Sequence, residues 1–209
     1  MPVFPKLKHL SAVQEKIKRG DAVKIGVFCS GNGDRSPLAH RVLQTTFNNL
    51  GYRNVEVFSF GTSVSPSSHH GAASSRTSAH AKEMGYDLSS HSRRHIGDDD
   101  VQADIKKADL LLAMSPSHLA MAVEYSADES PQIMPHLLGK TWTLKGFADR
   151  KEWTRGPRQV LGGIARRLSL RDPYFHDKTS EGERAFRKDL NAVEMTAKKA
   201  VRRLIGMKR

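Results

Sequence analysis

The single cysteine of this chain, Cys29, stands where its neighbours could make it reactive. It follows the apolar run 23–28, which predicts a buried strand, and it opens the segment 29–37, Cys-Ser-Gly-Asn-Gly-Asp-Arg-Ser-Pro. Ser36 is a favoured helix N-cap, and Pro37 suits the first helical position. A strand, a glycine-bearing loop and a helix N-terminus direct backbone N–H groups at one point, which suits an oxyanion such as phosphate. Because these groups also stabilise a thiolate, the segment predicts a phosphate cradle with a nucleophile at its floor.

Residues 29–37 resemble the active-site loop of the low-molecular-weight protein tyrosine phosphatases, whose motif is Cys-x5-Arg-Ser/Thr with Gly and Asn inside it. Cys-x5-Arg alone is a weak signal in a basic chain, but Gly31, Asn32, Ser36 and Pro37 also stand at family positions. Four further segments match family motifs in order: Ser-Phe-Gly-Thr at 59–62, Asp-Leu-Ser-Ser-His-Ser-Arg-Arg at 87–94, Ala-Asp-Leu-Leu-Leu-Ala-Met at 108–114 and Asp-Pro-Tyr at 172–174. Matches in one order along the chain are hard to explain by chance.

The resemblance implies distinct catalytic roles for three residues. Cys29 would attack the phosphorus atom and become a phosphocysteine, while the planar guanidinium of Arg35 would bind two phosphate oxygens. Asp172 would protonate the leaving oxygen and then activate the water that releases phosphate. The other expected site residues are, for substrate binding, Ser30, Gly31, Asn32, Gly33, Asp34, Ser36 and Tyr174, and, as supports, Ser59 and His91.

Five of these residues also have a plainer interpretation. A lone cysteine is most often a small buried hydrophobe, and Asp-Pro pairs such as the one at Asp172 are common in turns. Ser36 could do no more than cap its helix, and Asn32 could simply tolerate a left-handed turn. His91 could be an ordinary loop histidine.

Two positions inside the loop depart from the family. Many members have a second cysteine where this chain has Asp34, and that cysteine forms a reversible protective disulfide with the nucleophile. A carboxylate beside the cradle repels a phosphate dianion unless it turns outward or pairs with a basic residue, so we expect Asp34 to turn away and activity to be retained. Tyrosine-specific relatives usually have a bulky aliphatic residue where this chain has Gly33, and arginine-phosphate-specific relatives have threonine. Gly33 therefore predicts a roomier, less selective pocket.

Hydrophobic periodicity places the loop in an α/β protein. Apolar runs predict strands at 23–28, 55–60, 109–114 and 140–144. Strands separated by helices form a parallel sheet with helices on both faces. The resemblance implies a doubly wound sheet of four parallel strands in the order 2-1-3-4, plus an extra N-terminal helix. We divide the chain into an N-terminal helical extension, 1–22, and a phosphatase-like domain, 23–209, which has a basic insertion at about 145–171.

Composition narrows the class of protein. A chain of 209 residues can bury a sizeable core, and no run approaches the roughly 18 apolar residues of a membrane helix. The first ten residues show no signal peptide, and one cysteine fits a reducing compartment, so we expect a cytoplasmic location. The net charge of +12 could indicate an acidic or nucleic-acid partner, or only a generic basic surface. The basic insertion could likewise draw acidic substrates toward Asp172, or be a solvated loop.

The leading hypothesis is a cysteine-dependent phosphomonoesterase that acts on phosphotyrosine in proteins. The nearest alternative is the same chemistry on phosphoarginine or small phosphoesters, whereas arsenate reduction on this fold needs additional cysteines. An alternative of a different class is a non-catalytic phosphate- or RNA-binding module silenced by Asp34. Histidines at 69–70 and at 91 and 95 lack a matching cysteine or carboxylate set, so we expect neither a metal nor another cofactor.

Overall fold

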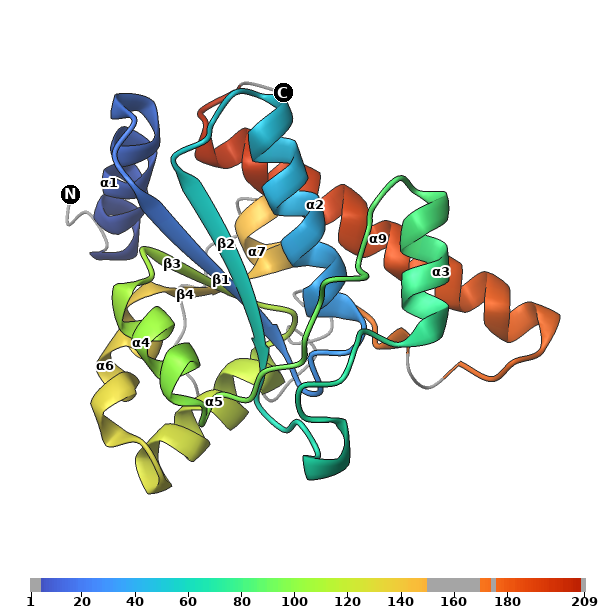
Figure 1. Cartoon of the computed structure of the whole chain (residues 1–209). Coiled ribbons are helices and arrows are strands. Elements are labelled where there is room, and N and C mark those ends of the chain that lie inside the picture. The colour runs from blue at the N-terminus through green and yellow to red at the C-terminus, as the bar shows by residue number, and fades with distance from the viewer. Residues whose placement is uncertain (1–4, 150–169, 174–175, 208–209) are drawn as a thin grey trace.

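A sheet of four parallel strands in the order β2-β1-β3-β4 lies at the centre of the protein (Figure 1). The computed structural model describes residues 5–149, 170–173 and 176–207. The strands are β1 (Val23–Cys29), β2 (Val55–Gly61), β3 (Leu110–Ala113) and β4 (Thr141–Thr143). Their residues are almost all buried, as expected for apolar strands covered on both faces. The predicted α/β class and strand order are confirmed, and every strand lies within one residue of its predicted ends.

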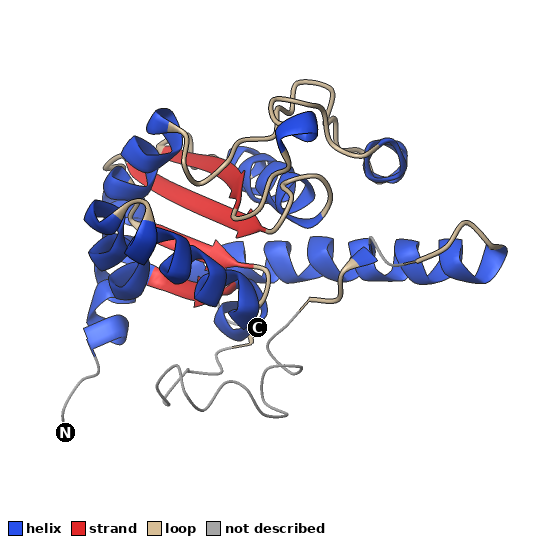
Figure 2. Cartoon of the chain, turned by 90° about the horizontal axis from the view of Figure 1, so that it is seen from below, coloured by secondary structure: helices blue, strands red, loops and turns tan. Residues whose placement is uncertain are grey.

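Helices cover both faces of the sheet (Figure 2). One face is covered by α2 (Arg35–Asn49), α7 (Leu144–Ala148) and α9 (Ser180–Leu204), and the other by α4 (Asp99–Lys107), α5 (Pro116–Asp128) and α6 (Met134–Lys140). Helix α3 (Ser75–Glu83) packs beside α9, while the short 3-10 turns η1 (Pro66–Ser68) and η2 (Pro131–Ile133) lie in loops. Among the residues that the structure describes, no helix is long and apolar enough to cross a membrane.

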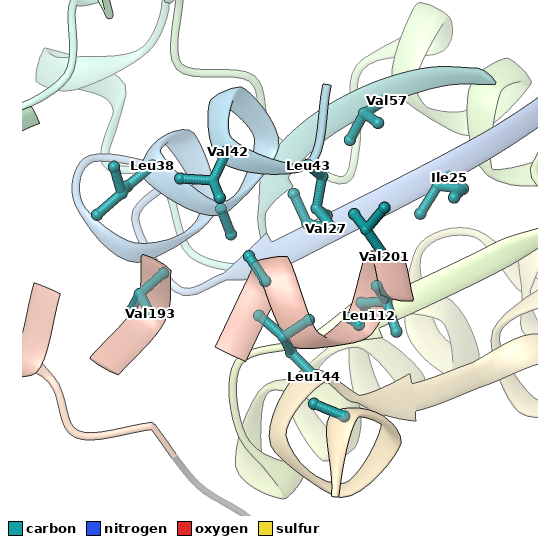
Figure 3. Packing of buried hydrophobic residues seen from close by; sticks show 14 of the residues in the cluster. Ile25, Val27, Leu38, Val42, Leu43, Val57, Leu112, Leu144, Val193 and Val201 are labelled. Atoms are coloured by element: carbon teal, nitrogen blue, oxygen red, sulfur yellow. The ribbon is translucent and has the colours of Figure 1, made fainter. Parts of the chain in front are cut away.

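Alternate strand residues supply two hydrophobic cores. Ile25 and Val27 of β1 point toward α2 and α9, where they meet aliphatic side chains such as Val42 (Figure 3). Phe28 points to the other face and stacks on Phe60 of β2, with 4.9 Å between ring centroids. Because successive strand side chains alternate, β1 is anchored on both faces up to the residue where its loop begins.

The predicted N-terminal helix is confirmed as α1 (Pro5–Arg19). Its Leu10, Val13 and Ile17 are buried in the same core as β1, α2 and α9. Lys16 Nζ also lies 2.7 Å from Asp109 Oδ1 at the start of β3. Because α1 shares this core, removing it would expose apolar surface of the sheet domain. The domain boundary after residue 22 stays a prediction.

Helix α2 begins earlier than the sequence suggested. Arg35 is its first residue, and Asp34 occupies the N-cap position without a side-chain capping bond. The prediction that Ser36 caps the helix and Pro37 starts it is therefore wrong. Pro37 is tolerated because the N–H groups of a first turn have no helical acceptor. The shift releases the Ser36 hydroxyl for contacts with the loop.

Candidate active site

The loop between β1 and α2 is shaped by Asn32. Its backbone has φ 47°, in the left-handed region that asparagine adopts more readily than most residues. The side chain is fully buried, and its Nδ2 donates to the Ser59 carbonyl at 3.4 Å. Its Oδ1 accepts a hydrogen bond from Ser36 Oγ at 2.9 Å. Asn32 therefore fixes the turn through its backbone and both ends of its amide.

Cys29 ends β1 at the floor of this loop, with its sulfur 3.0 Å from Ser36 Oγ. As a thiol, Cys29 can donate to Ser36, which in turn donates to Asn32 Oδ1. As a thiolate, it can only accept, so the Ser36 hydroxyl would turn its hydrogen to the sulfur. The hydroxyl is thus placed to stabilise the anion that a nucleophilic cysteine requires.

Neighbouring segments bind the carbonyl groups of the loop. Thr62 N donates to Cys29 O and Ser63 N to Ser30 O, both at 3.0 Å. Ser74 N donates to Gly33 O at 2.9 Å, and the Asn32 carbonyl lies 2.9 Å from His91 Nε2. Among the described residues, none accepts a hydrogen bond from the N–H groups of residues 30–34. Those amides are available to phosphate oxygens.

Arg35 joins the loop to a segment more than 130 residues away in the sequence. Arg35 is 5% exposed, and its Nη1 donates to the Leu170 carbonyl at 3.2 Å. Its Nη2 forms an ion pair with the Asp172 carboxylate. Leu170 is itself buried, and its N–H donates to Met114 O, just after β3, at 3.1 Å. The predicted phosphate-binding arginine and the predicted acid are therefore direct neighbours.

His118, which the sequence analysis missed, contacts the Arg35 guanidinium at the same nitrogen as Asp172. Its Nε2 is 3.4 Å from Arg35 Nη2, and its Nδ1 is 2.9 Å from Ser115 Oγ. Burial, reinforced by the charge of Arg35, lowers the pKa of His118 to about 3. The ring is therefore neutral, so Nε2 can accept from Arg35 while Nδ1–H donates to Ser115. Its position at the carboxyl end of β3 was the available signal, because ligands bind at that end of parallel strands.

Most of the predicted site residues line one cavity of about 300 Å³. Its predicted members are Cys29, Ser30, Gly31, Gly33, Asp34, Arg35 and Asp172, and its additional members are Ser63, Ser74 and Arg93. Asn32 and Ser36 are fully buried beneath it. Tyr174, which the resemblance implies for substrate binding, lies outside the described residues, as does most of the basic insertion at 145–171.

Asp34 lines the cavity, but its carboxylate is occupied. Its Oδ1 accepts hydrogen bonds from the hydroxyls of Ser74 and Thr77 at the N-terminus of α3. The sequence predicted that Asp34 turns away from the cradle, whereas it lines the cavity and its carboxylate is bonded to hydroxyl groups. Two donors and a helix N-terminus disperse the negative charge, which reduces its repulsion of an anion in the cavity.

The two predicted supports, Ser59 and His91, lie behind the loop. They line a second cavity of about 230 Å³ together with His40. His40 Nδ1 is 3.4 Å from Ser59 Oγ, and burial, followed by the nearby charge of His91, lowers the pKa of His40 to about 4. Burial also lowers the pKa of His91, against the effect of its bond to the Asn32 carbonyl. In the described part of the chain, no group of three or more His, Cys, Asp or Glu residues could hold a metal ion.

Comparison with known families identifies the class of protein that this fold and site define. The family model "Low molecular weight phosphotyrosine protein phosphatase" matches residues 24–138, more than half of the 209-residue chain. The chain therefore belongs to the low molecular weight phosphotyrosine protein phosphatase family, and the predicted resemblance is confirmed. The match includes Cys29 and Arg35 but ends before Asp172, so the role of Asp172 depends on the geometry of the site.

Solved structures of the same fold come from several bacteria. Wzb of Vibrio vulnificus, in complex with benzylphosphonate, is 23% identical with a TM-score of 0.62, over 87% of this chain and 99% of that one. A low molecular weight protein tyrosine phosphatase from T. tengcongensis is 23% identical with a TM-score of 0.60, over 87% and 99%. The YwlE arginine phosphatase from Geobacillus stearothermophilus is 24% identical with a TM-score of 0.62, over 87% and 92%. At these identities the likeness shows a shared fold. No curated protein sequence matches this chain significantly.

Proposed function

We propose that this protein hydrolyses phosphate monoesters of tyrosine in proteins, through a phosphocysteine formed on Cys29. The observation that carries the proposal is the convergence of Cys29, Arg35 and Asp172 on one cavity. The three residues supply the three requirements of the reaction: a nucleophile, a fixed positive charge and a proton donor.

In the first step, the Cys29 thiolate attacks phosphorus and the bond to the leaving oxygen breaks. The N–H groups of residues 30–34 and the guanidinium of Arg35 bind the equatorial phosphate oxygens. Arg35 suits this role because its position is already fixed by Leu170 O and His118, so little reorganisation is needed during reaction. The proton that the leaving oxygen takes up comes from Asp172.

In the second step, Asp172 accepts a proton from water, which attacks phosphorus and restores the Cys29 thiolate. The pairing of Asp172 with Arg35 has a consequence for both steps. A phosphate dianion competes with the carboxylate for the same guanidinium, so substrate binding frees Asp172 to take up a proton from solvent and then donate it to the leaving oxygen. The acid is therefore released where and when the phosphoryl group is bound.

Phosphoarginine is the second candidate substrate. Its support is Gly33, where the family's substrate-selecting side chain is missing, together with the likeness to YwlE structures described as an arginine phosphatase. A comparison of kcat/KM for matched phosphotyrosine and phosphoarginine peptides decides between them. A ratio above about ten in either direction assigns the substrate class.

Hydrolysis of an aryl phosphate by the purified chain tests the proposed chemistry. We expect turnover that is abolished by Cys29→Ser and lowered by about 10²–10⁴-fold by Asp172→Ala. Rapid quenching in alkaline denaturant with labelled substrate should trap an acid-labile, thiol-bound phosphoryl group on the native chain, and Cys29→Ser should form no acid-labile adduct. Phosphate or phosphopeptide binding without any turnover would instead support the non-catalytic module.

A cytoplasmic location and an acidic or nucleic-acid partner belong to the proposal as well. Their support is the single cysteine and the net charge of +12. Binding of a mixed-sequence RNA at physiological salt, measured beside an acidic protein of similar charge, tests the partner. A weak, strongly salt-dependent affinity for both would reduce this prediction to a generic basic surface.

A further inference from the structure

Arg93 presents a guanidinium to the catalytic cavity from a firmly held position. Its backbone N–H donates to Gly71 O at 2.8 Å, and its carbonyl accepts from His70 N at 2.9 Å. The side chain is held as well, because its Nε donates to Ala72 O at 2.8 Å. These bonds fix where the two terminal nitrogens lie, as a binding group requires.

The guanidinium of Arg93 fills the space beside Gly33. A Cβ atom added to Gly33 would lie 2.9 Å from Arg93 Cζ and 3.0 and 3.2 Å from its terminal nitrogens. The sequence predicted an open, less selective pocket at this position, but a positive charge occupies it instead. Gly33 and Arg93 therefore act as a pair: the missing side chain makes room for the guanidinium.

The terminal nitrogens of Arg93 are available for binding. Within the described ranges, no carboxylate lies within ion-pair distance of Arg93 and no acceptor bonds its Nη1 or Nη2. Of the two acids that line the same cavity, Asp34 is bonded to Ser74 and Thr77, and Asp172 is paired with Arg35. Two adjacent guanidinium nitrogens match the two oxygens of a carboxylate in bidentate geometry.

The cavity is larger than the phosphoryl group that the loop would bind. Its volume of about 300 Å³ corresponds to about ten water molecules at their share of liquid volume. A substrate therefore brings further atoms into the cavity, and Arg93 lies among the residues they would meet. We propose that Arg93 is a specificity-determining residue that binds a carboxylate close to the phosphorylated residue, so that acidic phosphopeptides are preferred substrates.

This inference rests on the proposed function, and a pair of peptides tests it. The peptides carry the same phosphotyrosine and differ only in Glu or Gln at the flanking positions. We expect the native chain to favour the Glu peptide in kcat/KM by about tenfold, the worth of one charge-assisted hydrogen-bonded pair. Arg93→Gln should bring that ratio close to one, and Arg93→Lys, which keeps the charge without the fork, should give an intermediate ratio.

Arg53→Gln is the matched control for loss of a positive charge. Arg53 is exposed and precedes β2, whereas the site lies at the opposite, carboxyl ends of the strands. The control should keep the full preference for the Glu peptide. A native ratio near one would overturn the proposal, and so would an equal fall for both peptides in Arg93→Gln, which would assign Arg93 to the phosphoryl group.

Binding in a Cys29→Ser background separates this inference from the proposed function. The dissociation constants of the two phosphopeptides are measured with Arg93 intact and with Arg93→Gln added. If the native chain shows no turnover but Arg93 still confers a preference for the Glu peptide, the carboxylate site is supported and the proposed enzymatic activity is contradicted. Turnover without that preference would support the proposed enzymatic activity and contradict the carboxylate site.

Discussion

The two halves of the active site, the loop 29–36 and the segment 170–173, are held in place in different ways. The loop continues directly from a buried strand, and its carbonyls are bonded by residues 62, 63, 74 and 91 from separate parts of the chain. The segment 170–173 is attached through the buried Leu170 and through Arg35, which bonds both Leu170 O and Asp172. The phosphate-binding loop is thus continuous with a strand of the sheet, whereas the proton donor lies on a segment that docks against the sheet domain.

This difference makes Arg35 the link between the halves. The same guanidinium that would hold the phosphoryl group holds the acid segment through Leu170 O and the Asp172 carboxylate. Changes in the loop should therefore impair stability and binding together. Changes in the acid segment should impair turnover and leave phosphate affinity nearly intact.

Among the variants that compare the two halves, Arg35→Lys should have the largest effect, because it disturbs both halves at once. Lysine keeps one charge but cannot bond two phosphate oxygens, Leu170 O and His118 simultaneously. We expect kcat/KM for an aryl phosphate to fall by about 10²–10³-fold, the cost of removing a preorganised donor from a charged transition state. Steady-state kinetics measure the change, with Arg53→Lys as the matched control on an exposed arginine. A fall of less than tenfold would mean that the loop amides alone bind the phosphoryl group.

Asn32→Ala should show that the loop half couples binding to stability. Alanine tolerates the φ of 47° less well, and it removes the hydrogen bonds that the Asn32 amide makes with the Ser36 hydroxyl and the Ser59 carbonyl. We expect the free energy of unfolding to fall by about 1–3 kcal/mol. Phosphate affinity should fall in the same variant, by about tenfold.

Urea unfolding and phosphate competition measure the two effects of Asn32→Ala. Asn49→Ala, on an exposed position of α2, is the control and should change neither. Loss of affinity with full stability would show that the loop is not held by Asn32.

Leu170→Ala tests the other half against Leu38→Ala, a fully buried leucine in the first turns of α2. Leu38→Ala should lower the free energy of unfolding by about 2–5 kcal/mol. Leu170→Ala should lower it by less, because a segment that can detach loses at most the free energy of its own docking. Its kcat for a substrate with a poor leaving group should fall about tenfold, while phosphate affinity stays close to native. Equal losses of stability in the two variants would contradict the comparison between the halves.

The sequence predicted the loop half better than the acid half, for a physical reason. An apolar run, glycines, an asparagine and a proline are local signals, and they act within a few residues of Cys29. They were sufficient to place β1, the phosphate loop and α2. The error at the start of α2, with Ser36 as the cap, arose because the hydroxyl that could cap the helix is used by the sulfur and by Asn32.

The contacts missed from sequence are those between distant segments. His118 meets Arg35 from 83 residues away, and the hydroxyls of Ser74 and Thr77 reach Asp34 across 40 and 43 residues. Nothing in the periodicity of a helix or strand specifies which polar side chains converge when the sheet closes. Asp172 was found only through the resemblance, since Asp-Pro is otherwise a turn signal.

The smallest predicted effect concerns pH and belongs to the loop half. Burial, followed by the positive charges of His91 and Arg41, lowers the pKa of His40 from 6.5 to about 4. Between these two values the unfolded chain binds a proton at His40 that the folded chain does not. Stability therefore falls as pH decreases from 6.5 toward 4. From this residue alone we expect a loss on the order of 1–2 kcal/mol between pH 7 and pH 5.

His40→Gln tests how much of the pH-dependent loss of stability comes from His40, because glutamine does not titrate. Urea unfolding at pH 7 and pH 5 should show a smaller decrease in stability for the variant than for the native chain, by the amount expected of His40. His70→Asn is the control: His70 is exposed and has φ 58°, a conformation that asparagine accepts, so its variant should keep the full decrease. An unchanged decrease in His40→Gln would mean that water reaches the ring behind the loop. The phosphate loop would then be less firmly supported than its hydrogen bonds to Ser59 and His91 indicate.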